Sequence, residues 1–269
     1  MPYSAVTAIP ARKALVLAPH PDDEIFGCGG AIAAHVAQGV PVDVVILTDG
    51  ALFADAAIRE KESRAAAALL GYGEPEFWGL PDRELICNEA LVERVAQKIR
   101  SSSADLVYAP SPQEIHPDHC QLAMTALQAI RRVAGDLRIA QYEVGVPLRW
   151  PNLLLDISAR LELKQQAMRC FASQLERQPY DRQIAALNCY RTYTLTEEVT
   201  AAEAYRVMPA ADLEPGGDAE SVAPGACGRD EAARREIEST RQRLDAVLNS
   251  RSWKLTEPLR RLARLLRGD

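Results

Sequence analysis

The sequence has few aromatic residues, scattered cysteines and no long apolar run, and each shortage excludes a class of protein. Aromatic residues make up 6% of the 269 residues, and no apolar stretch approaches the roughly 18 residues of a membrane-spanning helix. The six cysteines include no CxxC pair, so they predict ordinary thiols and not a disulfide framework. The first thirteen residues lack the apolar segment of a secretory signal, which predicts a cytoplasmic protein.

What remains is the composition of a globular protein, 48% hydrophobic and 25% charged. The length fits one domain of about 200 to 250 residues with an appendage, or two small domains. The net charge of −6 is unevenly spread: residues 229–269 carry eleven Lys or Arg and seven Asp or Glu, and the preceding residues carry 20 and 30. An acidic body without a basic stripe predicts no nucleic-acid partner.

Short apolar runs alternate with longer helical patterns over the first two thirds of the chain. The runs predict strands at 14–18, 42–47, 76–80, 105–109, 137–144 and 153–157, and the longer patterns predict helices at 25–38, 56–70, 89–101, 120–133 and 158–175. Continuous apolar runs are typical of strands buried on both faces. The alternation predicts an α/β fold with a doubly wound, mostly parallel, Rossmann-like sheet.

Ligands in such folds bind beyond the carboxyl ends of the strands. That rule selects the loops that follow Ala18, Leu47, Leu80, Ala109 and Val144, where polar residues gather. We therefore expect the functional site of a domain spanning residues 1–209 at this edge of the sheet.

The C-terminal part of the chain has a different composition. Residues 210–228 are rich in Gly and Pro and predict a flexible linker, and residues 229–269 predict a helical, basic amphipathic tail. Leu255, Leu259, Leu262 and Leu266 share one helical face, flanked by arginines. Such a helix can lie on an anionic membrane surface, dock on a partner protein, or pack on its own domain or a second subunit.

One His and three carboxylates gather within five residues at the end of the first predicted strand: His20, Asp22, Asp23 and Glu24. Like charges this close raise one another's pKa unless a cation offsets them. A divalent metal is the natural offset, and imidazole with carboxylate suits Zn²⁺ or Fe²⁺. Capping of the next helix would account for one carboxylate but for neither the His nor the remaining charge.

A second cluster, His116-Pro117-Asp118-His119, follows the fourth predicted strand and holds two of the four histidines. Alone, a solvated loop would explain it equally well. Together with His20 and Asp23 at a neighbouring strand end, it supplies a third metal ligand, and three protein ligands leave a position for water. Asp118 either orients an imidazole by accepting its second N–H or caps the helix.

These two motifs resemble those of the LmbE-like, or PIG-L, family of metal-dependent N-deacetylases. The resemblance covers roughly residues 13 to 208. Weaker similarities lie in four further segments: Arg59-x-x-Glu62 with Leu70-Gly71, Leu80-Pro81-Asp82, Tyr142-Glu143, and Ala202-Glu203-Ala204-Tyr205.

The resemblance implies roles for five residues. His20, Asp23 and His119 would bind the metal, usually zinc and sometimes ferrous iron. Asp22 would take a proton from the metal-bound water, and His116, as imidazolium, would stabilise the oxyanion or protonate the leaving amine. The family acts mainly on N-acetylglucosaminyl groups attached to inositol, malate, lipids or glycopeptides.

Three further residues have two interpretations each. Tyr142 ends a predicted strand, where it could donate to the oxyanion or pack in the core. Arg59 could contact a substrate phosphate or hydroxyl, or lie on a solvated helix face. Asp49 could contact a sugar hydroxyl or make a turn. The run Gly27–Gly30 resembles a dinucleotide-binding loop only superficially, because it lies well beyond the strand end and lacks the third glycine.

We therefore expect a zinc-dependent deacetylase, with Fe²⁺ as the alternative metal, acting on an N-acetylated amino sugar. The segment from Leu248 to Arg260 is similar to C-terminal segments of bacterial glycosyltransferases and other surface-polysaccharide enzymes, which suggests a lipid- or nucleotide-linked glycan precursor at the cytoplasmic face of the membrane. The alternatives are a hydrolase of another small amide, such as a thiol-sugar conjugate, and a non-catalytic scaffold of a glycan-assembly complex.

Overall fold

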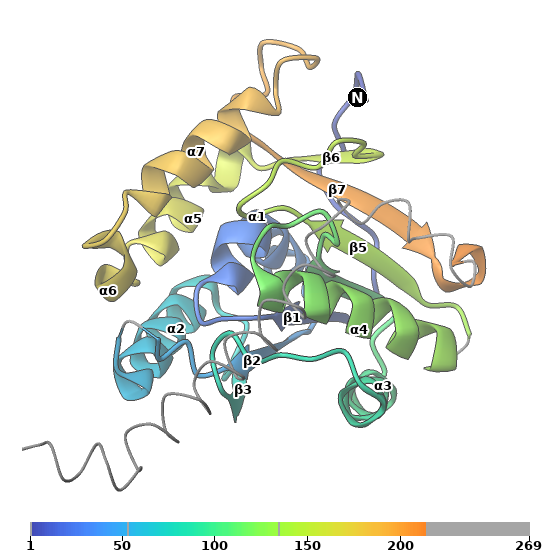
Figure 1. Cartoon of the computed structure of the whole chain (residues 1–269). Coiled ribbons are helices and arrows are strands. Elements are labelled where there is room, and N and C mark those ends of the chain that lie inside the picture. The colour runs from blue at the N-terminus through green and yellow to red at the C-terminus, as the bar shows by residue number, and fades with distance from the viewer. Residues whose placement is uncertain (1, 53, 134, 214–269) are drawn as a thin grey trace, which may run out of the picture. The chain divides into compact units, whose positions relative to one another are not determined.

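The computed structural model describes residues 2–52, 54–133 and 135–213, which form a seven-stranded sheet with helices on both faces (Figure 1). The strands lie in the order β3-β2-β1-β4-β5-β7-β6. The first five are parallel, and β7 runs antiparallel between β5 and β6. Their bounds are β1 Ala14–Ala18, β2 Val42–Thr48, β3 Glu76–Leu80, β4 Leu106–Pro110, β5 Arg138–Tyr142, β6 Leu153–Asp156 and β7 Ala202–Pro209. The predicted α/β fold with a mostly parallel sheet is confirmed.

Helices cover the two faces of this sheet in separate layers (Figure 1). One layer contains α1 (Asp23–Ala37), α2 (Ala56–Leu70) and α5 (Leu161–Met168), and the other contains α3 (Glu89–Ser102) and α4 (Pro117–Val133). The remaining helical elements are α6 (Ala172–Leu175), α7 (Tyr180–Tyr190), and two 3-10 turns at Ser158–Arg160 and Ala210–Asp212.

The two layers explain why the strand sequences are apolar throughout. In β1, Val16 packs with the core on the α1 side, and its neighbours Leu15 and Leu17 pack with the core under α3 and α4. Successive side chains of a strand point to opposite faces, so a strand covered on both sides needs an apolar residue at every position.

The order of the strands places a crevice between β1 and β4. The chain proceeds from β1 to β2 and β3 on one side, and then crosses to β4 and β5 on the other. The loops that follow β1 and β4 therefore diverge at their carboxyl ends, which is where ligands bind in open α/β sheets. Both histidine motifs lie in these two loops or at the starts of the helices that follow them.

The expected single helix at 158–175 is wrong, because the structure divides this segment. It contains a 3-10 turn, α5 and the short α6, with a break at 169–171. Phe171 is fully buried in the core at the break, and its ψ of 57° is not helical. The side chain of Glu62 then accepts hydrogen bonds from the backbone N–H and the hydroxyl of Ser173, which fixes the start of α6.

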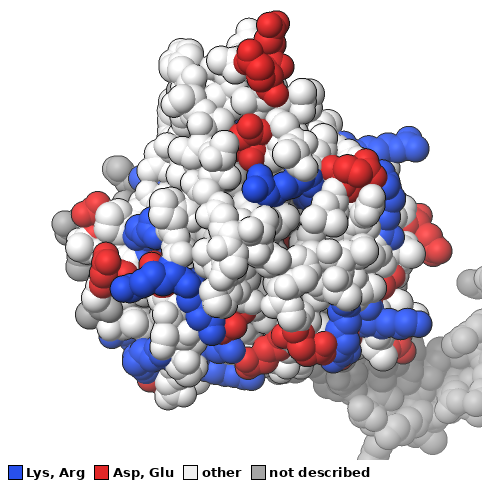
Figure 2. Space-filling model, turned by 180° about the vertical axis from the view of Figure 1, so that it is seen from behind, with Lys and Arg blue, Asp and Glu red and all other residues white. Residues whose placement is uncertain are grey.

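The first residues of the expected linker belong to the folded domain. Residues 210–212 form a 3-10 turn, and Leu213 is buried against the core under α4. The rest of the linker and the predicted tail at 229–269 lie outside the described residues. Within the described part, no helix is long and apolar enough to cross a membrane. The face seen in Figure 2 carries acidic and basic side chains side by side.

Candidate metal centre

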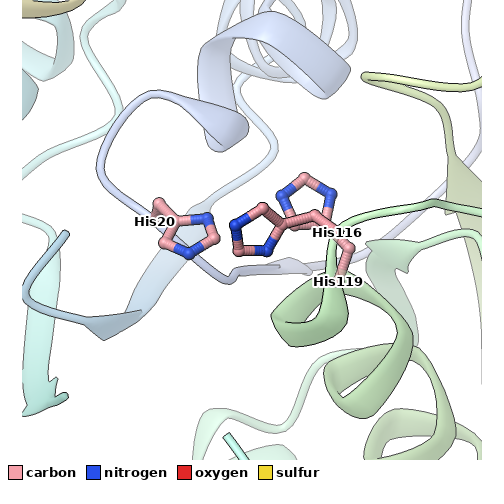
Figure 3. Close-up of side chains that lie close together, drawn as sticks. All are labelled: His20, His116 and His119. Carbon is pink, nitrogen blue, oxygen red and sulfur yellow. The ribbon is translucent and has the colours of Figure 1, made fainter. Parts of the chain in front are cut away.

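Three imidazole rings converge at the crevice (Figure 3). The ring centroid of His20, from the loop after β1, lies 4.6 Å from that of His116 and 5.4 Å from that of His119. The rings of His116 and His119, at the start of α4, are 5.2 Å apart. One nitrogen of each ring lies within 4.8 Å of the others, an arrangement that could hold a metal ion.

The carboxylate of Asp23 lies between two of these rings. Its Oδ2 is 3.1 Å from Nδ1 of His20 and 3.1 Å from Nε2 of His119. Burial raises the pKa of Asp23, but the neighbouring His119 and His20 outweigh it and hold the pKa far below its usual range. Asp23 is therefore a carboxylate at neutral pH, shared by the two histidines predicted to be its fellow ligands.

The second nitrogen of His20 is held by two further carboxylates. Its Nε2 lies 3.0 Å from Oδ2 of Asp118 and 3.3 Å from Oδ1 of Asp82. Asp118 also accepts hydrogen bonds from the backbone N–H groups of Arg83 and Leu85. Of its two predicted roles, Asp118 therefore has the first, because it orients the His20 ring and anchors the loop after β3. Metal-binding histidines are commonly oriented in this way.

These donors fit a metal ion on chemical grounds. Nε2 of His119 faces Asp23, whereas its Nδ1 is buried without a hydrogen-bond partner among the described residues, 3.7 Å from the carboxylate of Glu114. Neutral imidazole nitrogens beside ionised carboxylate oxygens are the ligands that Zn²⁺ and Fe²⁺ accept. His20, Asp23 and His119 can hold such an ion, with the ring of His116 beside them.

Asp22 lies next to this group in an unusual backbone conformation. Its φ is 130°, a value that residues other than glycine rarely adopt, and its backbone N–H donates to Oε2 of Glu24. Its own carboxylate accepts a hydrogen bond of 3.0 Å from Nη2 of Arg59. Burial raises the pKa of Asp22 to about 7, although the Arg59 guanidinium lowers it. Asp22 can therefore exchange a proton near neutral pH.

The Arg59-x-x-Glu62 pair on α2 makes hydrogen bonds to two segments beside the crevice, the loop after β1 and the start of α6. Arg59 is 4% exposed and donates to the carbonyl oxygens of Pro21 and Gly50 as well as to Asp22. It therefore does not lie on a solvated helix face; its observed contacts are these two carbonyl oxygens and the ion pair with Asp22, and a contact with substrate stays a prediction. One turn later, Glu62 anchors α6, whose Gln174 lines the cavity.

The charge expected on His116 is not favoured by its surroundings. Burial, followed by the charges of His20 and His119, lowers the pKa of His116 to about 4. Its Nδ1 accepts a hydrogen bond of 3.3 Å from the backbone N–H of Asp118, so the neutral ring carries its proton on Nε2. These surroundings favour a neutral His116 ring that donates from Nε2, and the imidazolium that the family resemblance implies stays a prediction.

A cavity of about 330 Å³ opens over these groups. His20, Asp22, Asp23, Arg59, His116 and His119 all line it, together with Phe26, Leu52, Asp82, Arg83, Glu114, Ile115, Val144, Gly145, Gln174 and Tyr180. The structure therefore brings together six of the eight predicted site residues.

Tyr142 and Asp49 are the two that lie outside this lining. Tyr142 is fully buried, and its hydroxyl donates to the carbonyl oxygen of Leu17, so the expected contact with an oxyanion is replaced by a core contact. The Oδ1 of Asp49 accepts from the backbone N–H groups of Ala51 and Asp82. Asp49 thus makes a turn and holds the next loop, the second of its two predicted roles.

Sequence reasoning gave no site role to two carboxylates, although Asp82 stands in one of the segments that resemble the family. Asp82 follows β3 and reaches His20. Glu114 is 1% exposed, and its carboxylate accepts hydrogen bonds from three successive backbone N–H groups, at residues 144–146. These residues lie beyond the end of β5 at Tyr142, whereas the sequence predicted a strand to Val144. Both residues lie in loops at the carboxyl edge of the sheet, so their position was the signal that could have found them.

Comparisons with known proteins agree with this site. The family model described as PIG-L: GlcNAc-PI de-N-acetylase matches residues 15–130, a span that contains both histidine motifs. Diacetylchitobiose deacetylase of Thermococcus kodakarensis is 28% identical over 204 residues, which cover 65% of this chain and 76% of the relative. An uncharacterized deacetylase of Escherichia coli (strain K12) is 30% identical over 131 residues, covering 45% of this chain and 71% of the relative.

The fold has solved counterparts as well. The structure of N,N'-diacetylchitobiose deacetylase from Pyrococcus horikoshii matches with a TM-score of 0.66 and 28% identity, covering 78% of this chain and 89% of that chain. A relative with another reaction, 4-oxalmesaconate hydratase of Pseudomonas putida, is 27% identical over 194 residues, 61% of this chain and 75% of the relative. With both motifs inside the matched span, the chain belongs to the PIG-L, or LmbE-like, family of deacetylases.

Proposed function

We propose that this protein is a metal-dependent hydrolase that removes the acetyl group from an N-acetylated amino sugar of the N-acetylglucosamine type. The observation that carries the proposal is the meeting of His20, Asp23 and His119 with the carboxylate of Asp22 at one wall of a cavity. Relatives named as deacetylases of N-acetylated sugars support it.

The residues of the cavity have separate roles in the proposed reaction. A bound Zn²⁺, or Fe²⁺, supplies a Lewis acid and lowers the pKa of water towards about 7. Asp22 takes the proton as water adds to the amide carbonyl, because its pKa is close to neutral. His116 donates from Nε2 to the developing oxyanion. The proton then passes from Asp22 to the leaving nitrogen, the C–N bond breaks, and the products are acetate and an amine that takes up the remaining proton.

The substrate carries its sugar on a larger group, as a lipid- or nucleotide-linked precursor of a bacterial surface glycan. Two apolar side chains at the cavity, Leu52 and Ile115, are 46% and 75% exposed, and they support a lipid as that group. Contiguous exposed apolar surface is characteristic of binding surfaces, and these two side chains would contribute to such a surface beside the cavity. The predicted basic tail would bring the protein to the cytoplasmic face of the membrane.

Acetate release from a panel of N-acetylhexosamine derivatives tests the reaction. The panel contains free, nucleotide-linked and lipid-linked sugars and one thiol-sugar conjugate, each assayed with metal removed and then restored. We expect release that depends on zinc or iron and falls by at least a hundredfold in Asp22→Asn, which keeps the shape of the side chain but cannot accept the proton. Release from the thiol conjugate alone would move the proposal to that substrate class.

Two outcomes contradict the proposal. If metal binds but no acetate is released, while an unsaturated dicarboxylic acid is hydrated, the protein shares the reaction of the hydratase relative. If no metal binds, the scaffold interpretation replaces the enzyme. The lipid is tested separately: Leu52→Ser and Ile115→Ser should raise the KM of lipid-linked substrates about tenfold and leave the KM of the free sugar unchanged, since about 1.4 kcal/mol of apolar contact corresponds to a factor of ten.

A further inference from the structure

The glycine run Gly27–Gly30, which fits no nucleotide site, lies in the middle of α1 and is hydrogen-bonded in an unusual way. In a regular helix, the N–H of Gly30 would donate to the carbonyl of Phe26, and the N–H of Ala31 to that of Gly27. Here the N–H of Gly30 donates to Oε1 of Glu203 at 2.7 Å, and the N–H of Ala31 donates to Oε2 of the same carboxylate at 2.8 Å.

The two carbonyl groups of the same helical step also have side-chain partners. Nζ of Lys164 donates to the carbonyl oxygen of Phe26 at 2.9 Å, and that of Gly27 lies 3.3 Å from the hydroxyl of Tyr205, whose proton goes to Glu203. Three of the four backbone groups of two successive helical steps are therefore bonded to side chains from α5 and β7, and the fourth faces one. These side chains reach backbone groups in the middle of the single helix α1.

The three side chains, Lys164, Glu203 and Tyr205, form one closed group, which we call the α1 clamp. They are 0%, 2% and 0% exposed. Lys164 donates to Glu203 at 2.7 Å and to Oδ1 of Asn188 at 3.1 Å, and Tyr205 donates to Glu203 at 2.6 Å. A buried ion pair is costly unless its hydrogen bonds are made, and here the backbone of α1 completes them.

The glycines are required because the clamp and its neighbours occupy the space of their missing side chains. A Cβ on Gly30 would lie 2.4 Å from Ile157 and 2.9 Å from Glu203, and one on Gly29 would lie 3.0 Å from Lys164. A Cβ on Gly27 would lie 2.3 Å from the ring of Tyr142. The run therefore allows close approach of side chains to a helix backbone.

The step bonded by these side chains directly follows the turn that carries the site. Asp23 begins α1, and the N–H groups of Ile25 and Phe26 both donate to the carbonyl of Asp22 at 2.9 Å. Phe26 therefore joins both regions, since its N–H bonds this first turn and its carbonyl bonds Lys164. The direction of the first turn is set by where the clamp holds that carbonyl.

We propose that Lys164, Glu203 and Tyr205 are positioning residues, which hold the first turn of α1 so that Asp22 and Asp23 face the histidines across the crevice. The proposal rests on the proposed function for the identity of the site, but the clamp itself can be tested without any deacetylation. Its members do not line the cavity, so they do not touch the metal ligands or the substrate directly.

The test compares the parent protein with Glu203→Gln, Tyr205→Phe and a control, Ile99→Ala. Ile99 lies on α3 and is buried against the opposite face of the sheet, so its truncation lowers stability without touching α1. Circular dichroism and the melting temperature establish that each variant is folded. The two readouts are the dissociation constant for zinc and, in zinc-free protein, the amide hydrogen exchange of residues 23–26.

In Glu203→Gln we expect zinc affinity to fall tenfold to a hundredfold, as when the support of a metal ligand is lost, and exchange in the first turn to accelerate at least tenfold. Tyr205→Phe removes one hydroxyl and should change the zinc affinity and the exchange rate in the same directions, by about twofold to fivefold. If Glu203→Gln does not fold, the result for Tyr205→Phe tests the proposal. Ile99→Ala should leave both within twofold.

Unchanged exchange and unchanged zinc affinity in a folded clamp variant would overturn the proposal, as would equal changes in Ile99→Ala, because the clamp would then contribute only to overall stability. If the parent itself binds no zinc, the proposed function fails, and the exchange measurement alone still decides whether the clamp holds the first turn.

Discussion

Replacement of Arg59 by Met removes a buried cation 3.0 Å from the carboxylate of Asp22 and keeps a side chain of similar length. An adjacent cation lowers the pKa of a carboxyl group by about 1 to 3 units. The pKa of Asp22 is about 7 with Arg59 in place, so without it we expect a value of about 8 to 10. The ionised fraction of Asp22 at pH 7 then falls from about one half to between about 10% and 0.1%.

If Asp22 is the base, kcat/KM at pH 7 should fall about fivefold to five-hundredfold. The assay is the pH dependence of kcat/KM between pH 6 and 10 with saturating zinc. Because bound zinc lowers the pKa of Asp22 in both proteins, it makes the fall at pH 7 smaller, and the displacement of the acidic limb is the quantity to compare. The acidic limb of the profile should move up by 1 to 3 units, and the rate at high pH should return to within a few-fold of the parent. Arg59→Lys, which retains the charge, should shift the limb by less than one unit.

A loss of equal size at every pH, with the acidic limb in its original place, would refute this reasoning. Arg59 would then act on the substrate or on the shape of the loop, and not on the charge of Asp22. The melting temperature must be recorded beside the rates, because breaking a buried ion pair costs about 3 to 5 kcal/mol when the remaining charge cannot be neutralised.

Three further predictions concern stability. Zinc at 100 times its dissociation constant should raise the free energy of unfolding by about 2.7 kcal/mol, seen by calorimetry as a higher melting temperature that chelation reverses and that His119→Ala lacks. Burial lowers the pKa of His35 to about 4, so between pH 6.5 and 4 the unfolded chain binds a proton that the folded protein does not bind. The free energy of unfolding should therefore fall by about 3 kcal/mol over this range. Urea unfolding of His35→Gln should show a weaker pH dependence. Gly27→Ala places a Cβ 2.3 Å from the Tyr142 ring and should cost about 1 to 3 kcal/mol, whereas Gly39→Ala, in open space, should cost only the strain of its positive φ.

The parallel strands of this fold are predictable from sequence because helices cover them on both faces. The expected bounds 14–18 and 76–80 are those of β1 and β3, and the expected helix 56–70, closed by Gly71 at a φ of 76°, is α2. The antiparallel β7 was missed because its first residues alternate Ala with a buried Glu, and neither is a common strand residue. Its place depends on pairing with β5 and on hydrogen bonds to α1, which no local pattern encodes.

The functional site also has a part that the sequence predicts and a part that it does not. The predicted metal ligands His20, Asp23 and His119 stand in compact motifs at strand ends, so sequence and sheet topology together bring them to one crevice. The ion-pair partner of Asp22 could not be predicted from the sequence, because Arg59 lies 37 residues later on another element. Of the two interpretations of Tyr142, the structure has the core position, because the alternation of β5 turns its ring towards α1 and not towards the crevice.

The bond between Gly30 and Glu203 joins positions 173 residues apart, which has a consequence for how the protein is made. At about 5 to 20 residues per second, a ribosome completes this distance in roughly 9 to 35 s. During that interval the nascent chain contains the first motif, and later the second, but it does not yet contain β7, whose Glu203 bonds to α1. A chain terminated before β7 therefore keeps all the histidines of both motifs and loses the support of the helix between them.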